Sequence, residues 1–578
     1  MSLPLTFSKP CITNPSCSHL QPWIGLLVIL ALSISGLNAN ADSVRYQPEV
    51  NKLEPKTLEC DVAVYGGTPA GVTAAIQAAR PGKSVIFISF NGFVGGMTSG
   101  GLTATDLGEK ESIGGMALEF YKRVGNLKGF KPSRAESLYR AMIEESKLTL
   151  LLNRPLVSAK IESGRIIAIG LQSGETVRAR MFIDATYEGD LLAAANVSYQ
   201  VGREPSSAYN ESLGGQWQQI SWKNTYQFCR LPISPFSDPE NPRSGLLPEI
   251  ATDPAGKPGE GDFKVQAYNF RTQVSKAKDR IPFPKPKDYD PGRYDLLARF
   301  LNLNPEVRWA LNYTVKPMTD GPVQLRNGDS NNAGSFSTDY VGGNYQWPDG
   351  TYKPGSFKTI QSPRRGLTVS LPKLYEIREK IFQDHVNYQQ GLYYFLANDP
   401  QVPEPLRKRV KAFGLDPGEF PGTGHWPHQL YIREGRRMVS DYVMTQANCE
   451  RECIAQDSIG LASYPMDSHF CQRVVVEENG HTTVRNEGGF GHPCKKGPYP
   501  VSYRSIVPRE NECTNLLVPV SLSSSHVAFG SIRMEPVFMI LGQSAGTAAT
   551  MAIDKDVPVQ QVDYEELKRE LLKLGQKL

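Results

Sequence analysis

Residues 60–71 read C-D-V-A-V-Y-G-G-T-P-A-G, and residues 72–80 continue as V-T-A-A-I-Q-A-A-R. Asp61–Tyr65 is a run of β-branched and aromatic types that predicts a buried strand, and the alanine-rich continuation predicts a helix. A glycine turn between a strand and a helix is typical of a nucleotide-binding βαβ unit, whose helix N-terminus faces a pyrophosphate. The predicted contacts at this turn are Gly66, Gly67, Thr68, Pro69, Ala70 and Gly71.

The turn departs from the usual G-x-G-x-x-G pattern at one position, and the second strand departs from it at another. Thr68 stands where the middle glycine would allow close backbone approach, so either the pyrophosphate lies further off or the hydroxyl adds a hydrogen bond. The second predicted strand, Ser84–Ser89, ends at a serine where an acidic residue would bind a ribose hydroxyl. Ser89 is therefore predicted to be a weaker cofactor contact.

A glycine-rich segment follows the second strand. Residues 92–101 read G-F-V-G-G-M-T-S-G-G, which is too rich in glycine for the interior of a helix or strand. Closely packed backbone at this place suits an extended cofactor lying along the loop. The predicted contacts are Gly95, Gly96, Met97, Thr98, Ser99 and Gly100.

Residues 150–192 predict a β-meander that ends in a second close approach to the same ligand. Strand-like runs lie near Ala159, at Ile166–Leu171 and at Val177–Ala185, and E-S-G-R and S-G-E turns separate them. The segment I-D-A-T-Y-E-G-D-L-L ends the meander. Its predicted ligand contacts are Asp184, Ala185, Thr186, Gly189 and Asp190.

Four separated blocks occur in an order that resembles the bacterial FAD-dependent oxidoreductase family, whose members often carry the label xanthan lyase. The blocks are the glycine turn, G-G-M-T-S-G-G-L-T-A-T-D, D-A-T-Y-E-G-D-L and the C-terminal R-M-E-P-V-F-M-I-L-G-Q-S-A-G. The resemblance runs from about Leu58 to the C-terminus. It implies an α/β fold of the glutathione-reductase type: a Rossmann-like FAD-binding domain, discontinuous in sequence, with an inserted α+β substrate domain. It also implies that FAD is the cofactor.

The chain divides accordingly into a signal peptide and three further segments. These are residues 1–41 (signal peptide), 58–196 (first part of the FAD domain), 197–499 (inserted substrate or cap domain) and 500–578 (second part of the FAD domain). Prolines and aromatics cluster in the insert, as in I-P-F-P-K-P-K-D-Y-D-P, and predict ordered loops that wall a pocket. Helical patterns appear there at Arg293–Leu301, Lys373–Asn387 and Pro405–Phe413.

The N-terminus predicts export. Trp23–Leu37 is an apolar run of signal-peptide length, too short for a comfortable membrane span, and N-A-N-A-D follows it with a small-residue cleavage pattern. Cleavage after Ala41 would start the mature protein at Asp42, with no stable membrane span left, in the periplasm or outside the cell. An uncleaved anchor is the alternative.

Cysteine usage agrees with export. Of nine cysteines, Cys11 and Cys17 lie in the leader, and five of the others crowd between 449 and 513, which favours one or two disulfides. Cys60 and Cys229 are the remaining two. The C-x-x-x-C spacing at Cys449 and Cys453 lacks a second close Cys/His pair, so no metal site is predicted.

The C-terminal block predicts a return to the FAD domain. Asn515–Leu522 is a predicted buried strand, Val537–Ile553 a helix, and Asp563–Leu574 a final docking helix. The resemblance implies that the N-terminal end of the middle helix faces the flavin pyrimidine, where its dipole stabilises the negative charge of the reduced ring. Close helix packing alone is the other interpretation of its small residues. These are Gly542, Ser544, Ala545 and Gly546.

Oxidising an alcohol or amine carbon needs a base for the heteroatom proton while the flavin takes the hydride. The candidates within the family-like blocks are His526, His469, Tyr503, Arg504 and Arg533. His526 is the first choice, because it stands just before the flavin-facing helix. A structural hydrogen-bonding role is the alternative for each of them.

The sequence therefore predicts an exported FAD-dependent dehydrogenase or oxidase acting on a small or carbohydrate-like polar substrate, with an unidentified electron acceptor. The dispersed net charge of +4 gives no support for nucleic-acid binding. The same geometry would serve a reductase of an activated double bond. A non-redox polysaccharide lyase and a carbohydrate-binding protein that keeps FAD as a structural plug are the remaining alternatives.

Overall fold

The fold is built around a seven-stranded sheet whose core strand is the one that begins the glycine motif. β1 (Lys56–Tyr65) pairs in parallel with strands on both sides, in the registers Val62↔Val85 and Tyr65↔Asp184. Side chains of β1 alternate between two hydrophobic cores, one on each face of the sheet, as expected for a strand covered on both sides. The spatial order is β3 (Thr149–Leu151), β2 (Val85–Ile88), β1, β6 (Glu175–Asp184), β5 (Arg165–Leu171) and β4 (Leu156–Glu162), with β19 (Leu516–Leu517) beside β6.

The predicted strand–turn–helix and β-meander are confirmed. The helix after the turn is α1 (Pro69–Ala79), and the meander is formed by the antiparallel strands β4, β5 and β6. The C-terminal strand is shorter than predicted: of Asn515–Leu522 only Leu516–Leu517 pair with β6. Pro519 follows and cannot donate to a ladder, which ends the pairing.

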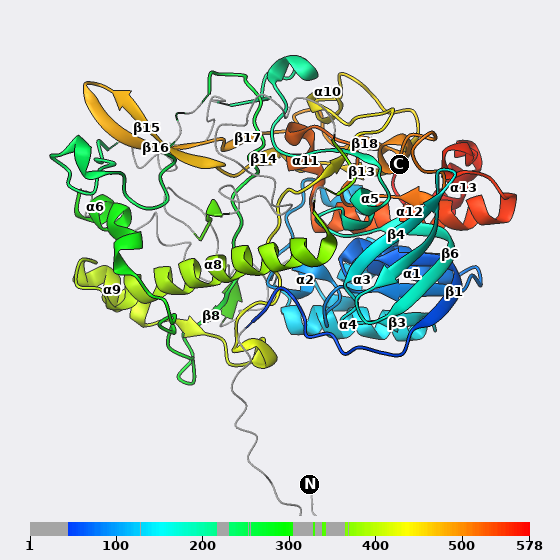
Figure 1. Cartoon of the computed structure of the whole chain (residues 1–578), viewed down its shortest axis with the longest axis horizontal. Helices are drawn as coiled ribbons and strands as arrows, with labels where there is room; N and C mark the ends of the chain where they lie inside the picture. Colours follow the sequence, from blue (N-terminus) through cyan, green and yellow to red (C-terminus); the bar gives the residue numbers. More distant parts are fainter. Residues whose placement is uncertain are drawn as a thin grey trace, which may run out of the picture. The chain divides into compact units, whose positions relative to one another are not determined.

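Two helices from opposite ends of the chain lie against each other beside the sheet (Figure 1). α12 (Glu535–Lys555) extends the predicted helix by two residues at each end and packs along α1. Among the described residues, α12 alone is long and apolar enough to cross a membrane, and 94% of its apolar window is buried inside the protein. That burial is typical of a core helix.

The predicted helices of the insert are present with shifted ends. Residues 293–301 fall in a 3₁₀ turn (Pro291–Tyr294) and α6 (Asp295–Leu303). The second becomes α8 (Leu371–Asn398), a much longer helix that runs across the view in Figure 1. The other helices are α2 (Gly96–Ser99), α3 (Gly115–Val124), α4 (Pro132–Glu145), α5 (Asp190–Ala194), α9 (Glu404–Lys411), α10 (Gln446–Cys449), α11 (His526–Ile532) and α13 (Tyr564–Lys573).

Small antiparallel ladders complete the insert. β7 (Ser198–Gln200) lies between β10 (Arg364–Arg365) and β12 (Arg437–Met438), and β8 (Gln273–Ser275) lies between β9 (Asn327–Asp329) and β11 (Gly414–Leu415). The remaining pairs are β13 (Ser458–Ala462) with β18 (Tyr499–Ser502), β14 (Met466–Ser468) with β17 (Phe490–His492), and β15 (Gln472–Glu478) with β16 (His481–Glu487).

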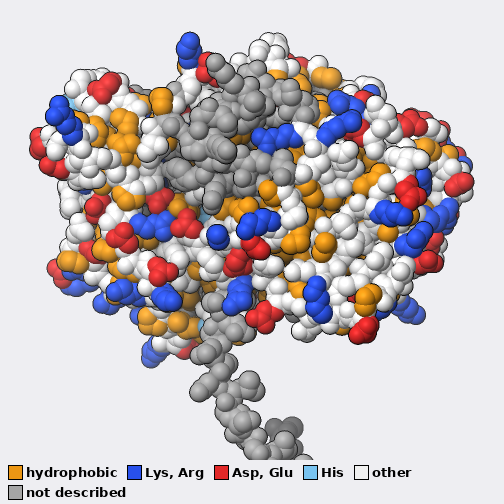
Figure 2. Space-filling view, viewed as in Figure 1, with side chains coloured by type: hydrophobic (Ala, Val, Ile, Leu, Met, Phe, Trp, Pro, Cys, Tyr) orange, Lys and Arg blue, Asp and Glu red, His pale blue; other side chains and the backbone are white. Residues whose placement is uncertain are grey.

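The structure describes residues 44–127, 129–216, 231–252, 254, 256–303, 338–342, 364–367 and 369–578, and the backbone of 327–329, as a computed structural model. The predicted leader, Asp42, Cys11, Cys17 and Cys229 lie outside these residues. Residues 41–578 form one compact unit, and the division into a split FAD domain and an insert stays a prediction. On the face shown in Figure 2, basic and acidic side chains are interspersed.

Two sequence predictions are wrong for the described residues. The glycine-rich segment contains a short helix, α2, because Gly95 and Gly96 take positive φ values of 95° and 47° and turn the chain into it. The expected disulfides are absent among the cysteines that the structure describes, all of which carry free thiols. These are Cys60, Cys449, Cys453, Cys471, Cys494 and Cys513.

Candidate active site

The turn after β1 brings backbone close to backbone, as predicted. Gly66 has a φ of 125°, and a Cβ there would lie 2.6 Å from the Thr186 nitrogen. Thr68 caps α1, because its Oγ1 accepts a hydrogen bond from the Gly71 nitrogen at 3.2 Å and donates one to the Ala185 oxygen at 2.7 Å. Thr68 therefore ties the turn to the end of the meander, and the first turn of α1 opens toward the same edge of the sheet.

The glycine-rich loop is held against this turn. The nitrogens of Gly95 and Gly96 donate to the Gly67 oxygen at 2.7 and 3.2 Å. Further along, the Met97 nitrogen donates to the Tyr187 hydroxyl at 3.0 Å, and that hydroxyl donates to Glu535 Oε1 at 2.8 Å. The loop, the meander end and the start of α12 thus meet at one place, which three separate blocks of sequence predicted.

Glu535 is an ionisable group that the sequence prediction missed. It is the first residue of α12, it is buried, and Thr98 Oγ1 lies 3.4 Å from its Oε2. Burial raises the pKa of Glu535 to about 8, although the hydrogen bonds from Tyr187 and Thr98 oppose the shift. Burial therefore favours the protonated form of this carboxyl at the helix terminus.

The turn at residues 184–190 is stabilised by its own carboxylates. Asp184 accepts hydrogen bonds from the nitrogens of Thr186 (2.9 Å) and Leu192 (2.7 Å), and burial raises its pKa to about 6. Asp190 forms a bidentate pair with Arg378 at 2.7 and 2.8 Å and binds Arg436 at 3.1 Å. Asp190 therefore joins the sheet to α8.

A cavity lies over these loops. Seven predicted cofactor contacts line it: Gly66, Gly67, Thr68, Ser89, Gly96, Thr186 and Asp190. The sequence prediction missed the aromatic and insert residues in its wall, among them Tyr46, Phe90, Phe93, Phe382, His428 and Leu430. Tyr46 comes from the N-terminal segment, and Phe90 and Phe93 follow β2. Phe382 belongs to α8, and His428 and Leu430 stand in a loop.

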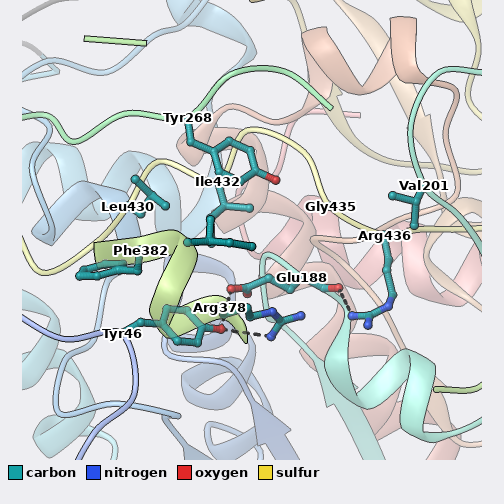
Figure 3. Close-up of a pocket in the computed structure, with 11 residues that line it drawn as sticks. Tyr46, Glu188, Val201, Tyr268, Arg378, Phe382, Leu430, Ile432, Gly435 and Arg436 are labelled. Carbon is teal, nitrogen blue, oxygen red and sulfur yellow. Dashed lines mark hydrogen bonds between the residues drawn. The ribbon is translucent and has the colours of Figure 1, made fainter. Parts of the chain in front are cut away.

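A second cavity, with about 560 Å³ of space, shares Tyr46, Glu188, Phe382 and Leu430 with the first (Figure 3). The Tyr46 hydroxyl donates to Glu188 Oε1 at 3.0 Å and accepts from Arg378 at 3.1 Å. Burial raises the pKa of Glu188. An apolar wall faces these polar groups, so the cavity suits a ligand with one apolar face and several hydrogen-bonding groups.

Two of the predicted catalytic residues meet in a chain of alternating charges. His469 Nδ1 lies 2.7 Å from Asp339 Oδ2, and its Nε2 lies 3.3 Å from Asp467 Oδ2. Arg433 pairs with Asp339 and Arg533 pairs with Asp467, each at 2.9 Å. Burial opposes ionisation of Asp467, but the charges of His469 and Arg533 hold its pKa below the ordinary value.

This cluster borders the glycine-rich loop. The Tyr431 ring lies under the guanidinium groups of Arg433 (4.8 Å) and Arg533 (5.7 Å), and Arg533 precedes Glu535 by two residues. At the other end of the loop, a Cβ at Gly101 would lie 2.7 Å from the Arg271 oxygen. Leu430 lines the first cavity, and the next residue, Tyr431, contacts Arg433 of the cluster.

His526 lies on the other face of β14 in a second, more deeply buried network. Its Nδ1 is 2.9 Å from Glu434 Oε2, and its Nε2 is 3.3 Å from Ser468 Oγ. Glu434 also pairs with Arg437. Burial opposes ionisation of Glu434, but the charges of His526 and Arg437 hold its pKa below the ordinary value. His526 is 1% exposed, whereas the His469 side chain is 19% exposed.

The structure places the other predicted catalytic residues away from these clusters. The Tyr503 hydroxyl donates to the Val559 oxygen at 2.6 Å, and Arg504 pairs with Asp457 at the surface while stacking on Tyr442. Both side chains have complete structural roles there.

The small residues of α12 serve helix packing in the structure. A Cβ at Gly546 would lie 2.5 Å from the Ala74 oxygen of α1, and a Cβ at Gly542 would lie even closer to the Ala70 oxygen. Ser544 donates to the Ile459 oxygen at 2.7 Å, and Ala545 is fully buried. None of the four lines either cavity.

A sequence profile of the FAD dependent oxidoreductase family matches residues 61–571. No protein with a curated description matches the chain. Solved structures match part of it. Bacillithiol disulfide reductase from Staphylococcus aureus is 20% identical over 22% of this chain and 38% of its own, with a TM-score of 0.18. Thioredoxin reductase from T. acidophilum is 20% identical over 26% and 40%, with a TM-score of 0.17. The 3-ketosteroid dehydrogenase from Rhodococcus jostii RHA1 is 14% identical over 25% and 51%, with a TM-score of 0.19. The matches thus span about half of those proteins or less.

Proposed function

The chain belongs to the FAD-dependent oxidoreductase family, and we propose that it is an exported dehydrogenase or oxidase of a small polar, carbohydrate-like substrate. The apolar run and cleavage pattern before Asp42 support export to the periplasm or beyond. The aromatic rings of Tyr46, Tyr268 and Phe382 in the second cavity support a sugar-like substrate, because aromatic faces stack on pyranose rings. The family assignment sets aside the lyase and the non-enzymatic alternatives.

The residues present fit FAD. The first cavity offers the N-terminal turn of α1 for the pyrophosphate and a glycine turn where side chains are excluded. A Cβ at Gly67, for example, would lie 2.8 Å from the Phe93 oxygen. Gly66, Gly67, Thr68 and Gly96 would hold the phosphates. When bound, FAD accepts a hydride at N5 and passes the electrons to an acceptor that stays unidentified.

The arrangement of Glu434, His526 and Ser468 carries the proposal of dehydrogenation. If His526 Nδ1–H donates to Glu434, the Nε2 lone pair faces the Ser468 hydroxyl. A substrate hydroxyl placed beside Ser468 would give its proton through Ser468 to His526. Glu434 stabilises the imidazolium that forms, as a carboxylate does beside other catalytic histidines.

One observation favours the reverse reaction, reduction of an activated double bond. Both ring nitrogens of His469 face carboxylates, and an imidazole can donate to both only in its protonated form. A protonated His469 suits the delivery of a proton to substrate rather than its removal. Oxidation of an alcohol would therefore depend on His526, and reduction of a double bond would depend on His469.

Anaerobic mixing of the holoenzyme with a library of sugars, polyols and hydroxy acids tests the main proposal. We expect at least one compound to bleach the oxidised flavin band near about 450 nm. If none does, but the photoreduced enzyme is reoxidised anaerobically by an activated alkene, the reductase proposal replaces it.

Two variants test which histidine transfers the proton in each reaction. We expect His526→Ala to keep the flavin spectrum and to slow bleaching by about 10²–10⁴-fold, the usual span for a general acid–base group. His469→Ala is the matched control and should slow alkene-dependent reoxidation instead. Loss of flavin from His526→Ala would indicate a cofactor contact, and unchanged bleaching would remove His526 from the proton path.

A further inference from the structure

We propose that His428, in the loop after α9, binds the 2′-hydroxyl of the adenosine ribose of FAD in place of the acidic residue that usually ends the second strand of this fold. The proposal depends on the cofactor of the family and not on the substrate proposed above.

The usual carboxylate is missing from the end of β2. Ser89 stands at that position, and residues 84–94 contain no Asp or Glu. Ser89 is 1% exposed, and its hydroxyl lies 2.8 Å from the Phe93 oxygen and 3.3 Å from Asn91 Oδ1. The single hydroxyl proton of Ser89 is therefore donated within the loop. The side chain has no second donor with which to bind a ribose hydroxyl.

The two carboxylates that line the first cavity already have partners. Glu188 accepts from the Tyr46 hydroxyl, and Asp190 is held by Arg378 and Arg436. Binding of a ribose hydroxyl by either would compete with these contacts, so another polar group is needed.

His428 is such a group. It is 6% exposed, it lines the same cavity as Ser89, and neither of its ring nitrogens has a hydrogen-bond partner among the residues that the structure describes. Buried polar atoms are seldom left unpaired, because each costs about 1–3 kcal/mol. A ligand in the cavity would supply the partners that these two nitrogens lack.

The ring is held firmly in this position. His428 stacks on Phe93 with centroids 3.6 Å apart and planes 5° apart, and it meets Phe420 edge-on at 5.6 Å. Trp426, two residues earlier, is 1% exposed and packs edge-on against Phe270. Since Phe93 follows Ser89 by four residues, the stack places the imidazole next to the end of β2.

The chemistry of the imidazole matches a ribose hydroxyl. Burial, with a smaller contribution from the charge of Arg140, lowers the pKa of His428 to about 3. The neutral ring has one N–H donor and one acceptor nitrogen, and a hydroxyl both donates and accepts.

The test compares two flavins on the same apoprotein. FMN lacks the adenosine half, so a residue that binds the ribose contributes to the affinity for FAD and not to that for FMN. His428→Phe keeps the aromatic stack on Phe93 and removes both nitrogens. His481→Phe, at an exposed position in β16, is the matched control. Flavin fluorescence titrations give the four dissociation constants, and thermal unfolding of the apoproteins checks the fold.

We expect His428→Phe to bind FAD about tenfold more weakly, as for the loss of one hydrogen bond, and to bind FMN as the wild type does. FAD carrying 2′-deoxyadenosine should bind the wild type about tenfold more weakly than FAD, and should bind His428→Phe as FAD does. Unchanged FAD affinity in the variant, an equal loss for FAD and FMN, or equal binding of the deoxy analogue by the wild type would each overturn the proposal. These outcomes leave the substrate proposal untouched, because no turnover is measured.

Discussion

Gly71 should be among the residues of this chain least tolerant of a side chain. A Cβ at this position would lie 3.0 Å from Phe87 Cε2 and would fall even closer to the Gly66 oxygen, a separation that real Cβ atoms essentially never show. The Gly66 oxygen belongs to the turn itself, so relief requires α1 to move away from β1.

The other side of α1 prevents that movement. α12 packs along it through glycines, and at Gly546 even one added carbon would lie 2.5 Å from the Ala74 oxygen. Overpacking a core usually costs about 1–3 kcal/mol, and backbone contacts on both sides place Gly71→Ala at the upper end. We therefore expect its free energy of unfolding to fall by about 3 kcal/mol, with loss of flavin, and we expect Gly71→Leu to yield apoprotein or no folded protein.

Urea unfolding and the ratio of flavin to protein absorbance measure both effects. Gly422→Ala is the matched control, because a Cβ there meets nothing within 4 Å and the backbone needs no positive φ. It should stay within about 0.5 kcal/mol of the wild type. A Gly71→Ala variant that is as stable as this control and keeps its flavin would refute the reasoning.

Three further predictions concern separate parts of the chain. The raised pKa of Glu535, about 8, means that the folded state keeps a proton that the unfolded state loses above about pH 4.5. Stability should therefore fall as the pH rises from about 5 to 8, and urea unfolding of Glu535→Gln should lack that slope. Arg504→Ala should change the rate of flavin bleaching less than about twofold, because Arg504 pairs with Asp457 at the surface. Mass spectrometry of protein from the native host should find the N-terminus at or close to Asp42, and an intact Met1 in a soluble cytoplasmic fraction would refute export.

The sequence predicted the features that depend on local pattern. Asp61–Tyr65 forms part of β1 because β-branched and aromatic residues favour a strand buried on both faces, and Gly66 turns the chain because only glycine tolerates its φ. The short helix within the glycine-rich loop was missed, because its formation depends on hydrogen bonds from Gly95 and Gly96 to the distant Gly67 oxygen. The helix propensities of single residues carry no information about such long-range contacts.

The sequence predicted the cavity residues that follow β1, β2 and β6. It largely missed those from the N-terminal segment, from α8 and from the loop at 428. Thr68 and Ser89 were found because they occupy fixed positions after strands. His428 and Tyr46 could not be found in this way, because they meet only when α8 and the loop at 428 fold onto the sheet. Glu188 lies within the D-A-T-Y-E-G-D-L block and was passed over there. The pairing of His469 with Asp339 spans 130 residues, so no spacing rule connects them.

One short helix and one short strand link both histidine networks to the glycine-rich loop. α11 begins at His526 and ends at Ile532, so its seven residues span about 10 Å, and Arg533 follows directly. β14 packs against it so closely that a Cβ at Gly530 would lie 2.6 Å from the Asp467 oxygen. Successive side chains of a strand point to opposite faces, so Ser468 meets His526 at one end of α11 while Asp467 meets Arg533 at the other. Since Glu535 lies two residues beyond Arg533 and bonds to Tyr187, any shift of α11 against β14 would move both histidine networks relative to the loop that carries Thr98. The absence of a side chain at Gly530 allows this close packing of α11 on β14.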